Sequence, residues 1–316
     1  MDPFPLDGHR GRIALFALSC LLAACASTEA KWSPGQLDQV RLEKCRLAER
    51  AYREETPDYP GLRDDLAKDP VAASWFVRML IRDLFTVREG RPLGEDQDLM
   101  RAAAKIEDPL EVRALSEIGE FGAVAVPTVV NDLLRHSQPQ PRELGIELLA
   151  RIGRPSLPAL REMAHDGEPR HRRAAGRAMA AVGIDTEVMA MLTELAADPD
   201  FTVRADALRS LRGVGGAPAA ALLRRSLSSD SDPFVRRQAA LSLAAFVELD
   251  SANAIIEYLA RCQREGDERG EDAAQEALCQ LSGKARGAGK KREYPLLVWQ
   301  TWVSTWKPEA KQPEPK

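Results

Sequence analysis

Four arginines stand at nearly constant spacing in this 316-residue chain, with 30, 32 and 32 residues between neighbours: Arg142, Arg172, Arg204 and Arg236. A guanidinium group is always charged and carries five donors, so a regular row of them could bind phosphates or carboxylates as an anion track. The same groups could instead tie neighbouring segments of the chain together. The residues around each arginine favour the second interpretation.

Each arginine occupies one position of a pattern that is written four times between residues 139 and 247. Three residues later the position is always small, and four further on it is always large and apolar: Leu149, Met179, Leu211 and Leu243. Helical spacing within a period in the thirties indicates an α-solenoid. One helix pair cannot bury its apolar face alone, so the copies must stack. We therefore expect the arginines to be structural.

The pattern resembles the HEAT repeat, in the short bacterial form that phycobilin lyases also carry. Its Asp-Pro-x-Val-Arg opening is visible in residues 232–236 and, without the proline, in residues 200–204. The apolar-Pro-x-apolar opening of second helices appears in residues 126–129 and 157–160. The resemblance covers residues 105–283 and implies an all-α superhelix of about six helix pairs. It says little about function, because such repeats serve as scaffolds in many settings.

Three positions depart from the pattern. Pro141 and His171 occupy the valine position, and Val247 replaces the closing glycine, so we expect irregular packing in those copies. The N-caps of the helices are clearer. Asp200 and Asp232 are predicted to cap first helices, and Asp185 and Ser251 to cap second helices.

A second candidate for chemistry is the thiol of Cys25, which directly follows Leu22, Ala23 and Ala24. Residues 13–24 form an apolar run too short to span a bilayer as a helix but typical of a secretory signal. The ending resembles the bacterial lipoprotein signal, in which the thiol after the small residues takes the lipid. Residues 1–12 are less basic than such signals usually are. The alternative is a start downstream of Met1, which would make the protein a cytosolic adaptor.

Cleavage before Cys25 would leave residues 25–35 as a polar tether that reaches at most ~35 Å from the membrane. Ala26 and Ser27 follow the cysteine, where an aspartate would imply retention at the inner membrane. By that resemblance the protein is lipid-anchored on the periplasmic side of a bacterial envelope, at the outer membrane rather than the inner.

Composition and spacing point away from other chemistry. The net charge of −4 is not that of a nucleic-acid binder, and the five cysteines form no CxxC pair. The HEAT-like deoxyhypusine hydroxylases bind iron through His-Glu pairs, but none of the four histidines here precedes a glutamate. We therefore predict no catalytic residue, metal or cofactor, and a scaffold that binds an unidentified protein. The alternative is a lyase-like or enzyme-accessory subunit.

The repeats are flanked by further segments. Residues 36–104 are predicted to form an N-terminal helical cap with helices over 36–55 and 71–88, separated by the breakers Thr56-Pro57 and Tyr59-Pro60-Gly61. Residues 284–293 form a basic linker, of which 284–292 could contact anionic lipid weakly. A cap helix over 294–306 carries Trp299, Trp302 and Trp306, with a partner-binding aromatic patch as the alternative. Residues 307–316 have no means of folding.

Overall fold

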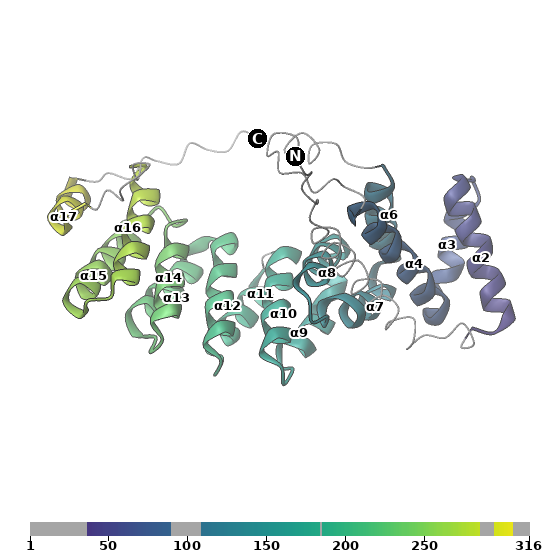
Figure 1. Cartoon of the computed structure of the whole chain (residues 1–316), viewed down its shortest axis with the longest axis horizontal. Coiled ribbons are helices and arrows are strands. Elements are labelled where there is room, and N and C mark those ends of the chain that lie inside the picture. The colour runs from purple at the N-terminus through teal and green to yellow at the C-terminus, as the bar shows by residue number, and fades with distance from the viewer. Residues whose placement is uncertain (1–36, 90–108, 184, 285–293, 306–316) are drawn as a thin grey trace, which may run out of the picture. The chain divides into compact units, whose positions relative to one another are not determined.

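The computed structural model describes residues 37–89, 109–183, 185–284 and 294–305 (Figure 1). Every regular element in these ranges is a helix, which confirms the all-α prediction. None of these helices is long and apolar enough to cross a membrane. The leader with Cys25, the tether, the basic linker beyond Lys284 and Trp306 all lie outside the described residues.

The chain divides into two units, residues 1–114 and 115–316. In the first unit, α2 (Gln39–Glu54), α3 (Tyr59–Ala67) and α4 (Pro70–Glu89) pack on one another. The ring centroid of Tyr52 lies 5.4 Å from that of Tyr59 and 6.0 Å from that of Phe76, so one aromatic cluster joins the three helices. The breaker interpretation of residues 59–61 was wrong. Pro60 lies in the first turn of α3, where proline is favoured because its missing N–H needs no partner.

In the second unit the helices alternate between two rows. The first row contains α8 (Pro139–Ile152), α10 (Pro169–Val182), α12 (Phe201–Val214), α14 (Pro233–Leu243) and α16 (Glu268–Ser282), each packed on the next. The second row contains α9 (Leu157–Ala164), α11 (Thr186–Leu195), α13 (Gly216–Ser229), α15 (Leu249–Glu265) and α17 (Leu296–Thr305). Ahead of them come α6 (Pro109–Phe121), which spans the boundary between the units, and the short turns η2 (Gly122–Val124), α7 (Val126–Val129) and η3 (Val130–Leu134), with η4 (Arg154–Ser156) before α9.

The small and large positions of the repeat are buried between packed helices. Leu149, Met179, Leu211 and Leu243 are all fully buried. At Gly145 an added Cβ would lie 3.1 Å from the Cβ of Leu133 and 3.2 Å from the backbone nitrogen of Leu134, so only a residue without a side chain fits easily. The small position at Gly145 thus lets α8 lie close against η3, while the large position fills the core.

Three of the four predicted caps are confirmed. The carboxylates of Asp185, Asp200 and Asp232 each accept a hydrogen bond from a backbone N–H in the first turn of α11, α12 and α14. The Thr202 hydroxyl, together with backbone N–H groups, holds the pKa of Asp200 below its ordinary value. The expected cap at Ser251 was wrong. The N-cap of α15 is Glu248, and the buried Ser251 hydroxyl donates to the Glu248 carboxylate at 2.9 Å because the helix begins earlier.

The helices that are followed by a closing glycine end differently from the helix of the copy in which Val247 replaces it. Gly153, Gly183 and Gly215 end α8, α10 and α12 with φ of 76°, 131° and 73°, a backbone region that side chains disfavour. These three helices each have 14 residues, whereas α14 has 11 and ends at Leu243, before Val247. The irregularity expected from Val247 is therefore a shortened helix, because a β-branched residue cannot take the conformation of the glycine.

Candidate binding groove

The turns before α8, α10, α12 and α14 share one geometry. In each turn a side chain six residues before the repeat arginine accepts a hydrogen bond from the N–H two residues after itself, at 2.8–3.1 Å: His136, Asp166, Asp198 and Asp230. The Nη1 atom of each repeat arginine donates to two carbonyl oxygens of the same turn, as Arg204 does to Asp198 at 2.9 Å and Pro199 at 3.2 Å. Every copy therefore fixes its own entry turn in the same way.

Two of these arginines also reach into the next copy. Arg172 donates through Nε and Nη2 to both oxygens of Asp198, at 2.7 Å each. Arg204 does the same with Asp230 at 2.9 and 3.0 Å. We call these two bidentate pairs the arginine ladder. Its side chains are only 7–14% exposed, and the carboxylates raise the pKa of both arginines. Since Nε, Nη1 and Nη2 are all engaged, the ladder has little capacity left for an external anion.

The ladder has no equivalent pair at its two ends. Asp166 contacts His171 and Arg135, at 3.1 and 2.9 Å, rather than Arg142. Cys262 stands 26 residues after Arg236, where Arg172 and Arg204 have an aspartate, and the Nε of Arg236 is buried without a hydrogen-bond partner. Burial raises the pKa of the Cys262 thiol. Cys262 lies on α15 and forms no disulfide, whereas Cys279 lies on the next helix, α16.

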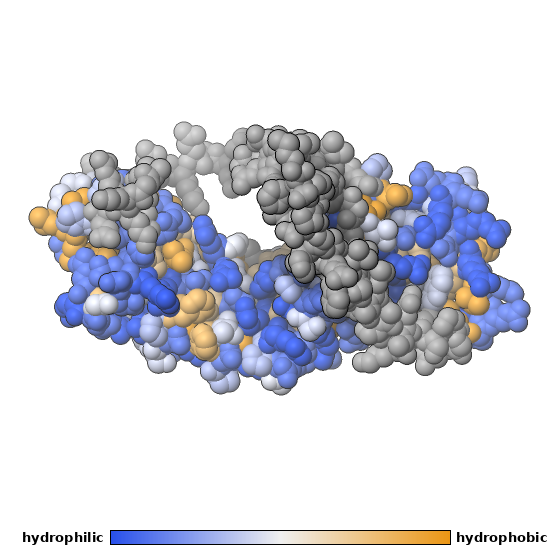
Figure 2. Space-filling view, in the orientation of Figure 1, coloured by the Kyte–Doolittle hydropathy of each residue, from blue (hydrophilic) through white to orange (hydrophobic). Residues whose placement is uncertain are grey.

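Trp299 and Trp302 lie at the end of the second row, where α17 packs on α15. Trp299 is fully buried, and its Nε1 donates to the Gln275 side chain at 3.0 Å. Trp302 is half-buried and meets Trp299 edge to face at 5.9 Å. Hydrophobic surface remains at α17 in Figure 2, and Leu297 is 70% exposed. In the free protein Trp299 is thus a core residue, while the opposite side of α17 stays open.

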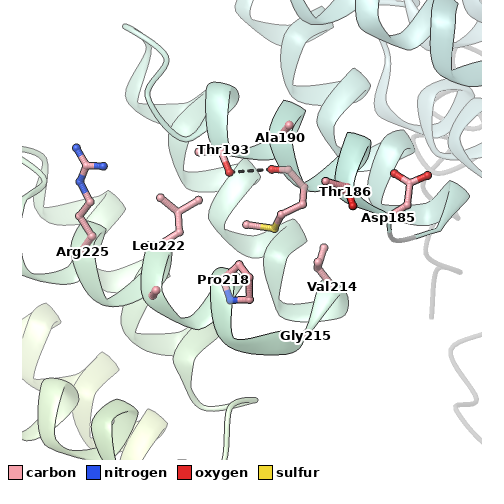
Figure 3. Close-up of a pocket in the computed structure, with 11 residues that line it drawn as sticks. Asp185, Thr186, Ala190, Thr193, Val214, Gly215, Pro218, Leu222 and Arg225 are labelled. Carbon is pink, nitrogen blue, oxygen red and sulfur yellow. Dashed lines mark hydrogen bonds between the residues drawn. The ribbon is translucent and has the colours of Figure 1, made fainter.

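A groove runs between α11 and α13, the neighbours in the second row that do not pack closely on each other (Figure 3). It has a volume of about 690 Å³ and is open to solvent. Helix α12 packs on both α11 and α13, and its end contributes Val214 and Gly215 to the lining. The rest of the lining comes from the two walls: Asp185, Thr186, Met189, Ala190 and Thr193, then Pro218, Ala221, Leu222 and Arg225.

Each wall presents one continuous helix face to the groove. On α11 the lining residues 186, 189, 190 and 193 follow the spacing i, i+3, i+4, i+7, and on α13 residues 218, 221, 222 and 225 do the same. A separate face of each helix is buried, with Val188, Leu192 and Leu195 on α11 and Ala219, Leu223 and Leu227 on α13. Both helices therefore carry a second, largely apolar face that the fold leaves uncovered.

Two charged residues mark opposite ends of the groove in Figure 3. Asp185 is engaged, because its carboxylate caps α11 and also pairs with Arg154. The Val188 N–H and the Arg154 guanidinium hold the pKa of Asp185 below its ordinary value. Arg225 is exposed and forms no ion pair with any described residue. The described residues contain no cluster of three or more potential metal ligands.

Sequence reasoning did not identify the ladder aspartates or the groove. The aspartates had a signal, since Asp166, Asp198 and Asp230 stand 32 residues apart. The sequence signal for the groove was weaker, because it consisted only of the second face of α11 and α13. Its small and polar residues look like an ordinary solvated surface until the separation of the two helices is known.

The family model described as HEAT repeats matches residues 126–212 and 189–279. A search of curated proteins finds no match. An engineered protein of known structure is 18% identical, with coverage of 61% of this chain and 98% of its own and a TM-score of 0.32. The CpcE–CpcF complex of phycocyanin lyase from Nostoc sp. PCC7120 is 20% identical, with coverage of 76% and 94% and a TM-score of 0.31.

Human deoxyhypusine hydroxylase in complex with glycerol is 17% identical, with coverage of 74% of this chain and 91% of its own and a TM-score of 0.26. None of these three structural likenesses bears on the activity of this chain. The repeats are assigned by the sequence match together with the four arginine copies and their shared turn geometry.

Proposed function

Because HEAT repeats make up residues 126–279 of this chain, we propose that it is a non-enzymatic scaffold that holds a partner protein in the groove between α11 and α13. The observation that carries the proposal is the uncovered apolar face on both walls. Apolar surface in a concave site favours association, since covering it removes it from water. The ladder arginines are excluded from this role because their donors are used within the fold.

The proposed binding is tested by a photo-crosslinking amino acid placed at Ala190 or Ala221, one exposed position on each wall. We expect both positions to crosslink the same partner in cells, and Leu222→Glu to abolish the product by placing a charge in the groove. Gln263 on α15 is an exposed control position outside the groove. Equal crosslinking from residue 263, or a product that survives Leu222→Glu, would show that the partner binds another surface.

We also propose that Cys25 carries a lipid, which would hold the scaffold on the periplasmic side of a bacterial envelope, at the outer membrane. Support comes from the apolar run of residues 13–24 and the small residues directly before the cysteine. The tether of residues 25–35 would then keep the folded part of the chain near the membrane surface. This part of the proposal is independent of the groove.

Labelled palmitate is expected to enter the wild-type protein and Cys20→Ser, but not Cys25→Ser. Cys20 lies within the same apolar run and makes a matched control, because its thiol does not follow the small residues. The Cys25→Ser protein should also move from the membrane fraction to the soluble fraction, since a single missing anchor removes the membrane affinity. Label that persists in Cys25→Ser, or an unlabelled wild type, contradicts the anchor.

A further inference from the structure

Resting on the proposed function, we propose that the groove accepts an amphipathic α-helix of the partner protein, and that a carboxylate on this helix pairs with Arg225. The walls, their spacing and the free charge each restrict what can bind there. Together they select one occupant.

The openness of the groove argues against a small molecule. Sites for such ligands bury most of the ligand surface, roughly 70–90% of it. The groove between α11 and α13 is instead open to solvent. A ligand lying there would leave much of its surface in water. A polymer segment can cover the same floor and continue beyond both ends, so a peptide chain fits better.

The walls argue against an extended peptide. Peptides that bind as strands gain their affinity from main-chain hydrogen bonds to an exposed sheet edge. Both walls here are helices, whose backbone groups are already paired along their length. An extended segment pressed between them would bury N–H and C=O groups without partners, which is costly. A helix satisfies its own backbone and presents only side chains.

The side chains of the walls favour apolar knobs at helical spacing. Ala190 and Ala221 are small and face the groove, next to the larger Met189 and Leu222. Small positions between larger ones form holes that can take a leucine, methionine or phenylalanine from a third helix. Because α11 and α13 each present residues at i, i+3, i+4 and i+7, the bound helix should carry its apolar residues at the same spacing.

The charge argument concerns Arg225. Its neighbour Arg224 is paired with Glu248, and at the other end Asp185 is paired with Arg154. Among the described groove residues, Arg225 is therefore the charged group left without an opposite charge. A carboxylate on the bound helix would complement it, and a cation there would be repelled. Arg225 thus sets both the sign of the partner's charge and its place along the groove.

The test uses a yeast-displayed library of helices, randomised along one face and selected on the full-length protein. We expect enriched helices to carry apolar residues at i, i+3, i+4 and i+7 with an aspartate or glutamate toward one end. Their affinity for Arg225→Glu should fall about tenfold, the factor that 1.4 kcal/mol represents. Replacing the acidic residue of the helix by lysine should restore binding to Arg225→Glu.

Arg212→Glu is the matched control, because Arg212 is an exposed arginine on α12 that does not line the groove. It changes the net charge equally and should leave the affinity unchanged. Ala221→Trp, which fills the groove from an exposed position, should abolish binding without disturbing the core. Enriched helices that bind Ala221→Trp normally, show no acidic preference, or weaken equally on Arg212→Glu overturn the proposal.

The selection and the crosslinking at residues 190 and 221 test different claims, so one can fail while the other succeeds. Crosslinking reports a partner in the groove whatever its secondary structure. A crosslinked partner together with a failed selection would overturn the proposal that the bound segment is a helix. The groove would remain the site where the partner binds. A successful selection without a crosslinked partner would show that the groove can bind such a helix. It would overturn the proposal that the groove binds a partner protein in the cell.

Discussion

Replacing Trp299 by alanine is expected to lower the free energy of unfolding by about 3–5 kcal/mol, as truncation of a buried aromatic residue generally does. Trp299 is fully buried, its ring lies 5.1 Å from that of Tyr294, and its indole N–H donates to Gln275. The Gln275 side chain also bonds the backbone of Tyr294 through both its oxygen and its nitrogen. Loss of the indole would leave a cavity and remove one partner from this buried amide. Urea denaturation followed by circular dichroism at the helix band measures the effect.

Trp302→Ala is the matched control for this prediction. Trp302 lies on the same helix but is only half-buried, so its truncation should cost clearly less than that of Trp299. Equal losses for the two variants would mean that α17 is held as a whole rather than by one anchor. A loss below about 1 kcal/mol for Trp299→Ala would show that the helix detaches readily in the free protein, as a partner-binding patch would.

Replacing Asp230 by alanine is expected to cost about 3–5 kcal/mol, because it leaves the charge of Arg204 buried without its carboxylate. The pair is bidentate, and its side chains are 14% and 9% exposed. The change also removes the acceptor for the Asp232 N–H in the entry turn of α14. Asp230→Asn can keep that turn bond, so the difference between the two variants separates the turn from the ion pair. The midpoint of urea unfolding gives both values.

Glu143→Ala is the control for this pair. Glu143 also joins two copies, through Arg177 at 2.6 Å, but the two side chains are 38% and 52% exposed. Water screens such a pair, so its loss should cost at most about 1 kcal/mol. Arg204→Ala should lower stability as well while preserving the crosslink from residue 190 at temperatures where the fold survives. Normal stability with a lost crosslink would restore the anion-track interpretation of the arginines.

The repeat was readable from the sequence because its signals are local. Arg204 and Asp200 lie within one helix start, and the small and large positions follow at helical spacing, so one copy already shows the pattern. The same reasoning found the caps at Asp185, Asp200 and Asp232. It failed at Ser251, where Glu248 offers a competing start one turn earlier. It also failed at Tyr59–Gly61, because proline in a first turn begins a helix as readily as it breaks one.

The groove could not be predicted in this way because it depends on spacing between helices that are distant in sequence. Residues 189, 190, 221 and 222 acquire their role only because α11 and α13 stay apart while α12 packs on both. Nothing local to either helix records that separation. The pairing of Arg204 with Asp230 is intermediate, since it spans 26 residues but recurs with the period of the repeat.

The arginine ladder allows a whole repeat to be added to the array without the loss of an ion pair. Each rung, meaning one bidentate pair of the ladder, joins an arginine to the aspartate 26 residues later. Both residues lie within the 32-residue period. A gene duplication that inserts a second copy of residues 201–232 directly after Asp232 would therefore bring its own arginine and its own aspartate in register. Every old rung would survive and one new rung would form. The copy number of this scaffold can thus change by one whole repeat without the loss of an ion pair of the arginine ladder.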